Sequence, residues 1–248
     1  MSTDAVARMS QIVRVEHLTK AFGNFRALYD VSFTVRTGEV LGLIGPNGAG
    51  KTTLFECLAG LLPATAGTVS HDDRPLAVHE RARLLFYLPD GITPWPAQSV
   101  RWALDFTIGF FEGAIDRRDE VIRELDLAPL LDCAIGTLSK GQRKRALLGV
   151  GLLTPHPILL ADEPFDGLDL RQTRDVARVL RSHATHSRTL FLSIHQITDA
   201  ARVCDRFVLL SGGRVCGEGT LDELTAIYMA RVGVAASGDL EEVFLALT

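Results

Sequence analysis

The sequence of 248 residues is poor in cysteine and has no long apolar run. Its cysteines form no CxxC pair and are Cys57, Cys133, Cys204 and Cys216. This scatter argues against a disulfide framework or a zinc ribbon and favours a reducing compartment. No stretch of 18 apolar residues is present, so we expect no membrane-spanning helix. Residues 1–15 lack the apolar centre of a signal peptide, and we therefore expect a cytoplasmic protein.

A strong excess of charge is also missing, because the net charge is −4 and the isoelectric point is near 6.0. We therefore expect no nucleic acid partner held by a basic surface. Hydrophobic residues make up 47% and charged residues 23% of the chain, which is typical of a folded globular protein. Lysine is scarce, because only four of the 26 basic residues are lysines.

Short apolar runs bounded by turn residues predict β-strands along most of the chain. They lie within 12–44, at 157–162, at 189–195 and in a hairpin over 206–219 that turns at Gly212-Gly213. Helical spacing separates these runs, which predicts an α/β fold around a largely parallel sheet with an N-terminal antiparallel β part. The segment 91–150 lacks a buried-strand run, and we expect it to be an inserted, mostly helical subdomain.

A phosphate-binding motif, GxxxxGK[ST], follows the buried strand expected at Val40–Ile44 and precedes a helical pattern. Its residues are Gly45, Pro46, Asn47, Gly48, Ala49, Gly50, Lys51 and Thr52. Backbone N–H groups and the helix N-terminus would surround the phosphates of a nucleotide, and Lys51 would add a full positive charge. The Thr52 hydroxyl would ligate Mg²⁺. The motif therefore predicts a P-loop nucleotide site.

Two acids, Asp162 and Glu163, end the apolar run that begins at Pro157. A strand end beside a P-loop would place Asp162 in the Mg²⁺ shell and Glu163 where it can polarise a water molecule near the γ-phosphate. His195 ends the run at 189–195 and would lie at the same edge of the sheet. We therefore predict Glu163 and His195 as catalytic residues.

Taken with these motifs, residues 12 to about 220 resemble the ATP-binding subunit of an ABC transporter. Leu138, Ser139, Lys140, Gly141 and Gln142 resemble the signature of that family, and Gly167, Leu168 and Asp169 belong to a segment that resembles its D-loop. Phe22 matches the aromatic residue that stacks on adenine, and the resemblance extends the ATP site to Ala27 and Thr53. It implies ATP and Mg²⁺ as ligands, with a core over 10–90 and 151–220, the signature subdomain over 91–150 and a helical tail over 221–248.

Two positions depart from the family pattern. Lys140 replaces a glycine of the signature, which adds a charge near the nucleotide. The glutamine of the Q-loop should follow residues 85–89, where this chain has Asp90, whereas Gln98 fits the register less well. An ionised carboxylate can ligate Mg²⁺ but cannot donate a hydrogen bond. We therefore expect Asp90, together with Thr52 and Asp162, near the metal.

The resemblance implies an ATPase that dimerises with a second ATP-binding subunit, as a homodimer or with a related chain. In the family the signature of one subunit faces the P-loop of the other. The dimer would power a separate polytopic permease from the cytoplasmic face of the membrane, and the export-type prokaryotic subfamily is the most similar. A soluble ABC-type ATPase that acts on a macromolecule or an assembly scaffold remains the alternative.

Residues 91–110 follow Asp90 and are unusually apolar for a loop and the start of a helix. We expect Trp95 to be exposed between Pro94 and Pro96 and to contact the permease. By contrast, we expect Trp102 and Phe106 to pack inside the helical subdomain. In the tail we expect Asp239 to cap a helix whose Leu240, Phe244 and Leu247 dock on the protein's own core.

Overall fold

The computed structural model describes residues 11–113, 115–184, 188–232 and 240–247. Strands β1 (Gln11–Phe22), β2 (Phe25–Arg36), β4 (Ala66–His71) and β5 (Arg74–Pro75) form an antiparallel sheet in the order β2-β1-β4-β5. Apolar side chains from β1 and β2, including Val15, Leu18 and Phe33, are buried on one face of this sheet. The N-terminal antiparallel part is therefore present as predicted.

The second sheet has six strands in the order β10-β9-β3-β8-β7-β6. They are β3 (Val40–Ile44), β6 (Leu85–Leu88), β7 (Ile158–Asp162), β8 (Thr189–Ile194), β9 (Arg206–Ser211) and β10 (Arg214–Gly219). All neighbours are parallel except β9 and β10, which form the predicted hairpin. Every residue of β3, β7 and β8 is buried, which explains why these strands read as continuous apolar runs.

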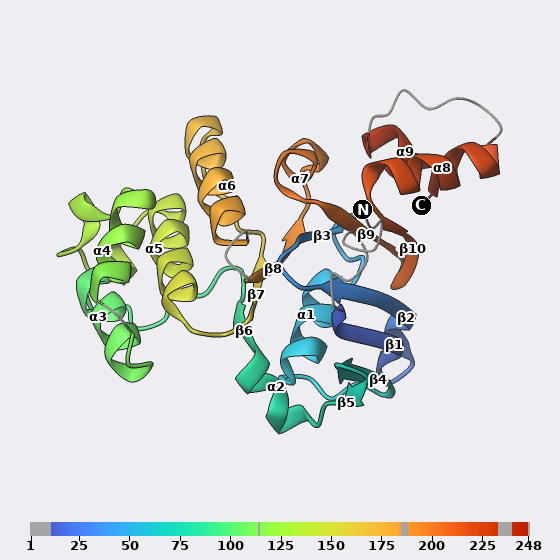
Figure 1. Ribbon diagram of the computed structural model, residues 1–248, viewed down its shortest axis with the longest axis horizontal. Coiled ribbons are helices and arrows are strands. Elements are labelled where there is room, and N and C mark those ends of the chain that lie inside the picture. The colour runs from blue at the N-terminus through green and yellow to red at the C-terminus, as the bar shows by residue number, and fades with distance from the viewer. Residues whose placement is uncertain (1–10, 114, 185–187, 233–239, 248) are drawn as a thin grey trace, which may run out of the picture.

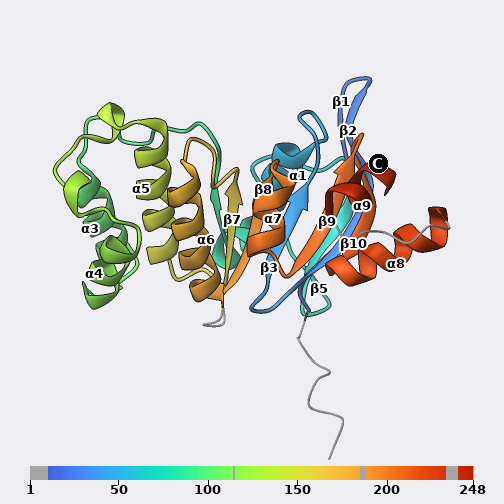
Figure 2. The ribbon, with the colours of Figure 1, turned by 90° about the horizontal axis from the view of Figure 1, so that it is seen from above.

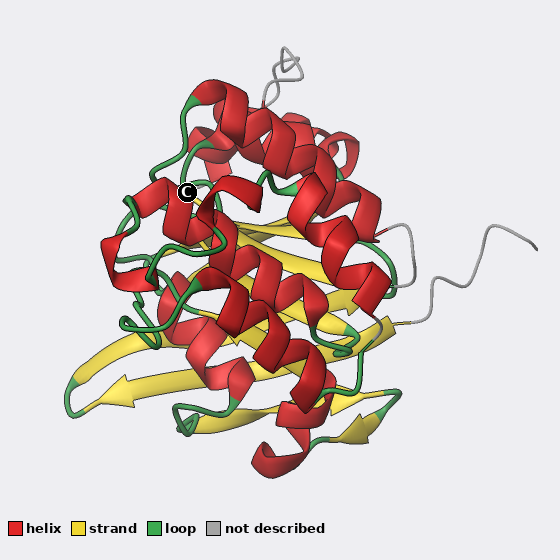
Figure 3. Ribbon diagram, turned by 90° about the vertical axis from the view of Figure 1, so that its left-hand side faces the viewer, coloured by secondary structure: helices red, strands yellow, loops and turns green. Residues whose placement is uncertain are grey.

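Helices cover both faces of the six-stranded sheet. Helices α1 (Lys51–Ala59) and α2 (Val78–Leu84) belong to the side shared with the antiparallel sheet, where the Phe55 ring lies 4.9 Å from that of Phe191. The opposite side carries α6 (Leu170–Ala184), α7 (Ile197–Val203), α8 (Leu221–Val232) and α9 (Leu240–Leu247). Figure 3 shows the strands running behind the helices. The α/β class with a largely parallel sheet is thus confirmed.

Between β6 and β7 the chain is helical, with α3 (Val100–Phe110), α4 (Ile115–Glu124) and α5 (Lys140–Leu153), and short 3-10 turns at Ala128–Leu130 and Ile135–Thr137. These helices lie together at one end of the molecule, and α8 and α9 lie at the other (Figures 1 and 2). In α9, Leu240, Phe244 and Leu247 are buried against the core, as expected, whereas Asp239 lies outside the described residues. None of the described helices is long and apolar enough to cross a membrane.

The expected burial of Trp102 and Phe106 is wrong. Their side chains are 36% and 45% exposed, and the two rings stack on each other at 5.0 Å. The physical reason is that α3 buries its other face, through Val100, Ala103, Leu104, Thr107 and Ile108. The expected exposure of Trp95 is confirmed, because 40% of the surface of this residue is exposed to solvent.

Candidate functional site: a P-loop cavity and its acids

The P-loop connects the end of β3 to the start of α1, as its sequence context predicted. Gly50 has a φ of 105°, in the left-handed region that favours glycine. A side chain at Gly45 would meet the Leu210 carbonyl oxygen at 2.3 Å, so the loop can follow this path only without one. The tight turn then leaves the first N–H groups of α1 free of helical partners and available to an anion.

Lys51 is buried at the start of α1. Its Nζ donates a hydrogen bond to the Gly45 carbonyl oxygen at 2.7 Å and lies 3.6 Å from a carboxylate oxygen of Glu163. The lysine therefore connects the P-loop with the acidic end of β7. A triphosphate in the cavity would offer this ammonium group stronger acceptors than a carbonyl oxygen.

Asp162 is buried at the end of β7 and accepts hydrogen bonds from three hydroxyl groups, one of which is Tyr87 Oη on β6 at 3.5 Å. Thr52 Oγ1 donates to Oδ2 at 2.8 Å, and Ser193 Oγ on β8 donates to Oδ1. These bonds bring four elements, α1, β6, β7 and β8, to one carboxylate. Ser193 was not predicted, and only the pairing of Asp162 with Ser193 across β7 and β8 reveals it.

Glu163 directly follows β7 with a φ of 49°, which is unusual for a residue with a side chain. Its backbone N–H is held by Ser193, through the carbonyl oxygen at 3.2 Å and the hydroxyl at 3.1 Å. Its carboxylate accepts a hydrogen bond from His195 Nδ1 at 2.7 Å. Backbone strain of this kind concentrates at functional sites, and here it aims the carboxylate toward Lys51 and His195.

These groups surround a cavity of about 440 Å³. It is lined by Phe25, Ala27, Pro46, Asn47, Gly48, Gly50, Lys51, Thr52, Thr53, Asp90, Asp162 and Glu163. Most of the predicted ATP-site residues are thus brought together, including Ala27, and the predicted metal residue Asp90 lines the same cavity. Phe22 is not part of the lining, and Lys20 Nζ lies 4.8 Å from its ring centre. Phe25, opposite Phe22 in the β1–β2 pairing, lines the cavity and was missed, because the resemblance pointed to Phe22.

The signature residues begin α5, and none of them is among the described residues that line this cavity. Ser139 caps the helix, because its Oγ accepts a hydrogen bond from the Gln142 N–H at 3.3 Å. A side chain at Gly141 would meet the Gly167 carbonyl oxygen at 2.4 Å, so the signature packs directly on the D-loop of the same chain. Lys140 Nζ forms an ion pair with Asp166 of that loop.

The oxygen atoms of Thr52 and Asp162 fit Mg²⁺, which prefers carboxylate and hydroxyl ligands. Within the described part of the chain, no three His, Cys, Asp or Glu side chains converge on a metal position. A Mg²⁺ ion here would therefore need further oxygen atoms from a bound phosphate, which is how proteins usually hold this ion.

Asp90 lines the cavity but is also held from outside it. Its Oδ1 accepts a hydrogen bond from Lys144 Nζ of α5 at 2.6 Å. Burial opposes ionisation of Asp90, but the hydrogen bond and the charge of Lys144 outweigh it and lower the pKa of this carboxyl. The predicted metal residue is therefore an anion with a cationic partner.

Comparison with known proteins agrees with the interpretation of this cavity as an ATP site. The model of the ABC transporter family matches residues 28–166. The chain is 32% identical over 218 residues to the lipopolysaccharide export system ATP-binding protein LptB of Escherichia coli K12, with 84% of this chain and 90% of that protein covered. The protein of the same name from Acidithiobacillus ferridurans is 31% identical over 234 residues, which cover 90% and 96% of the two chains.

Solved structures show the same fold. An ATP-binding subunit of an ABC transporter superposes with a TM-score of 0.83 at 27% identity, with 95% of this chain and 99% of that chain covered. The ATP-binding cassette MJ0796, solved as a dimer with ADP and Pi, gives a TM-score of 0.74 at 23% identity, with 84% and 98% covered. This chain therefore belongs to the ABC transporter family as an ATP-binding subunit, an ABC-type ATPase.

Proposed function

We propose that this subunit binds Mg²⁺ and ATP in the P-loop cavity, dimerises, and powers transport through a separate membrane permease. The observation that carries the proposal is the convergence of Lys51, Thr52, Asp162 and Glu163 on one cavity, with His195 bonded to Glu163. Lys51 would bind the phosphates and Thr52 and Asp162 the metal ion. Glu163, oriented by Ser193 and His195, would accept a proton from the attacking water or polarise it.

The adenine subsite would lie at the open end of the cavity beside the tip of the β1–β2 hairpin. Phe22 remains the predicted stacking residue by its resemblance, and Phe25 is the aromatic side chain that lines the cavity. Either ring would offer an apolar face to the base.

The site is expected to be composite, because the signature does not line the cavity of its own chain. Ser139 and Lys140 would face the nucleotide on the P-loop of a second subunit, and twofold pairing would make two such sites. Sedimentation with ATP and the Glu163→Gln variant would measure this dimer directly.

Mixing two inactive variants tests the composite site. Lys51→Ala should inactivate the P-loop and Ser139→Ala the signature, so each homodimer should hydrolyse ATP poorly. A heterodimer has one site in which both halves are intact, so a 1:1 mixture should recover up to about a quarter of the wild-type rate. The measurement is phosphate release per subunit against protein concentration. A mixture no more active than its components, or a wild-type rate independent of dilution, would count against the composite site.

The permease would dock on an exposed aromatic patch formed by Trp95, Trp102, Phe106 and Phe110. The ring centres of neighbours in this patch lie between 5.0 and 6.0 Å apart. Tryptophan and other aromatic side chains carry much of the binding energy at interfaces, and an amphipathic helix of a permease would cover such a surface. The patch begins in the loop that follows Asp90, so a partner there would contact the segment that enters the ATP cavity.

Removing the exposed ring of Trp95 should weaken permease binding. We expect Trp95→Ala to lower the affinity by about 30-fold, which corresponds to about 2 kcal/mol for the loss of an interface anchor. The isolated subunit should keep its fold and its basal ATPase rate. The measurement is copurification with the permease and transport in vesicles. Leu245→Ala, which truncates an exposed side chain on α9, is the matched control. Equal recovery of the permease with both variants would place the docking site elsewhere.

The direction of transport is proposed to be export, because two relatives that match most of this chain are named as ATP-binding proteins of lipopolysaccharide export systems. The subunit would then be peripheral on the cytoplasmic face of the membrane. The alternative, a soluble ABC-type ATPase acting on a macromolecule, predicts ATPase activity and dimerisation without any copurifying polytopic membrane protein.

A further inference from the structure

Lys144 links the signature helix to the ATP cavity. It lies in the second turn of α5, and its side chain is only 11% exposed. Its Nζ donates to the Asp90 carboxylate at 2.6 Å and to the backbone carbonyl oxygen of Asp162 at 3.3 Å. One ammonium group therefore holds both the Asp90 side chain and the chain end of β7.

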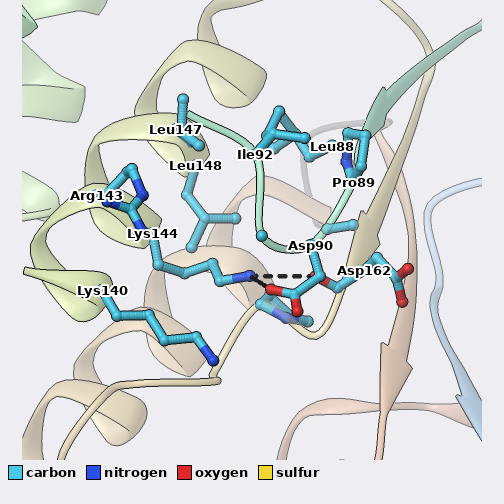
Figure 4. Close-up of a pocket in the computed structure, with 13 residues that line it drawn as sticks. Leu88, Pro89, Asp90, Ile92, Lys140, Arg143, Lys144, Leu147, Leu148 and Asp162 are labelled. Carbon is cyan, nitrogen blue, oxygen red and sulfur yellow. Dashed lines mark hydrogen bonds and ion pairs between the residues drawn. The ribbon is translucent and has the colours of Figure 1, made fainter. Parts of the chain in front are cut away.

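The surroundings of this ion pair are mostly apolar. A small cavity of about 30 Å³ lies between α5 and the ends of β6 and β7 and includes Leu88, Ile92, Leu147 and Leu148 in its lining. Figure 4 shows Lys144 extending from α5 across this cavity to Asp90, with Asp162 behind. Partly desolvated surroundings strengthen the attraction between opposite charges and make an unpaired charge costly.

A buried lysine in these partly desolvated surroundings needs a counterion, and the Asp90 carboxylate supplies it. Asp90 stands where the family resemblance places a neutral glutamine, and its negative charge is compensated by the positive charge of Lys144. The same carboxylate also lines the P-loop cavity beside Thr52 and Asp162, the proposed metal residues.

We propose that Lys144 is a positioning residue of the ATPase site: it holds the Asp90 carboxylate at the edge of the cavity and competes for it with the divalent cation of the bound nucleotide. The inference rests on the proposed function, in which that cavity binds a metal–ATP complex. The competition predicts the direction in which metal affinity changes. While Lys144 is paired with Asp90, part of the negative charge available to a cation is already neutralised, so removing Lys144 should strengthen metal binding.

The expected results follow from these charges. Lys144→Met should tighten metal binding by about tenfold, and Asp90→Asn should weaken it by a similar factor, as removal of one charge near a metal does. In the Asp90→Asn background, Lys144→Met should change the metal affinity by no more than about threefold, because only the direct repulsion between the lysine and the metal is then removed. The affinity for the nucleotide without metal should change much less than the affinity for the metal.

The probe is Mn²⁺, titrated by electron paramagnetic resonance into the full-length protein with a saturating non-hydrolysable ATP analogue. Lys144→Arg keeps the charge and the donor and should restore wild-type Mn²⁺ affinity. Lys140→Met removes the same charge from the first turn of α5 and serves as the matched control. Lys140 pairs with Asp166 and acts on Asp90 only through its charge, without a hydrogen bond. We therefore expect Lys140→Met to change the Mn²⁺ affinity by less than about threefold.

The outcomes separate the two proposals. The competition is supported if Lys144→Met binds Mn²⁺ more tightly than the wild type and if this gain is lost when Asp90→Asn is also present. An unchanged Mn²⁺ affinity in Lys144→Met, or a shift equal to that of Lys140→Met, overturns this inference while leaving the proposed ATP site intact. If Lys144→Met does not fold, an Asp90→Asn variant with wild-type Mn²⁺ affinity overturns it equally. A wild-type protein that binds no nucleotide would overturn the proposed function, and this inference with it.

Discussion

Glu163→Gln should lower the rate of ATP hydrolysis by about 10²–10³-fold or more while ATP binding persists. Glutamine has the same shape and can still bond to His195 Nδ1 and lie near Lys51, but it cannot accept a proton from the attacking water. The negative charge that faces Lys51 is also lost. The measurements are phosphate release at saturating ATP and the dissociation constant of ATP, each for the wild type and the variant.

The neighbouring acid provides the contrast for this experiment. Asp162→Asn removes the charge that Thr52 and Ser193 hold in place, so it should weaken binding of the Mg²⁺–ATP complex itself. Near wild-type turnover by Glu163→Gln would remove Glu163 from the catalytic role. Loss of ATP binding in the same variant would instead give Glu163 a structural role in the P-loop cavity.

Lys51→Ala should raise the dissociation constant of ATP by about 10- to 100-fold, because charge-assisted hydrogen bonds to the phosphates are lost. In the present structure Lys51 Nζ contacts the Gly45 carbonyl oxygen and faces Glu163, so the variant also leaves that carboxylate without its cation. We therefore expect electrostatic repulsion between Glu163 and the phosphates to add to the loss. Isothermal titration calorimetry with ATP would measure the change.

The control for Lys51→Ala is a variant that removes one positive charge elsewhere. Arg178 is exposed on α6 and does not line the P-loop cavity, so Arg178→Ala should bind ATP like the wild type. The phosphate-binding role of Lys51 would be refuted by ATP affinity that is equal in the two variants.

The residue sequence by itself determined the P-loop cavity to a large extent. The motif from Gly45 to Thr52 is contiguous, and the apolar runs around it specify a buried strand followed by a helix. Asp162 and Glu163 end another buried strand, and parallel strands bring their carboxyl ends to one edge of the sheet. Local pattern and this general rule of topology suffice to bring Lys51, Asp162 and Glu163 together.

Only the tertiary structure decided which side chains meet across distant segments. Asp90 and Lys144 lie 54 positions apart, and no periodicity tells which turn of α5 faces the end of β6. The spacing of Trp102 and Phe106 shows that they share one face of α3, but it does not tell whether that face is buried or exposed. The packing of the subdomain buries the opposite face of the helix. The physical reason is the same in both cases: local spacing fixes which residues share a face, whereas the packing of the whole chain determines what that face contacts.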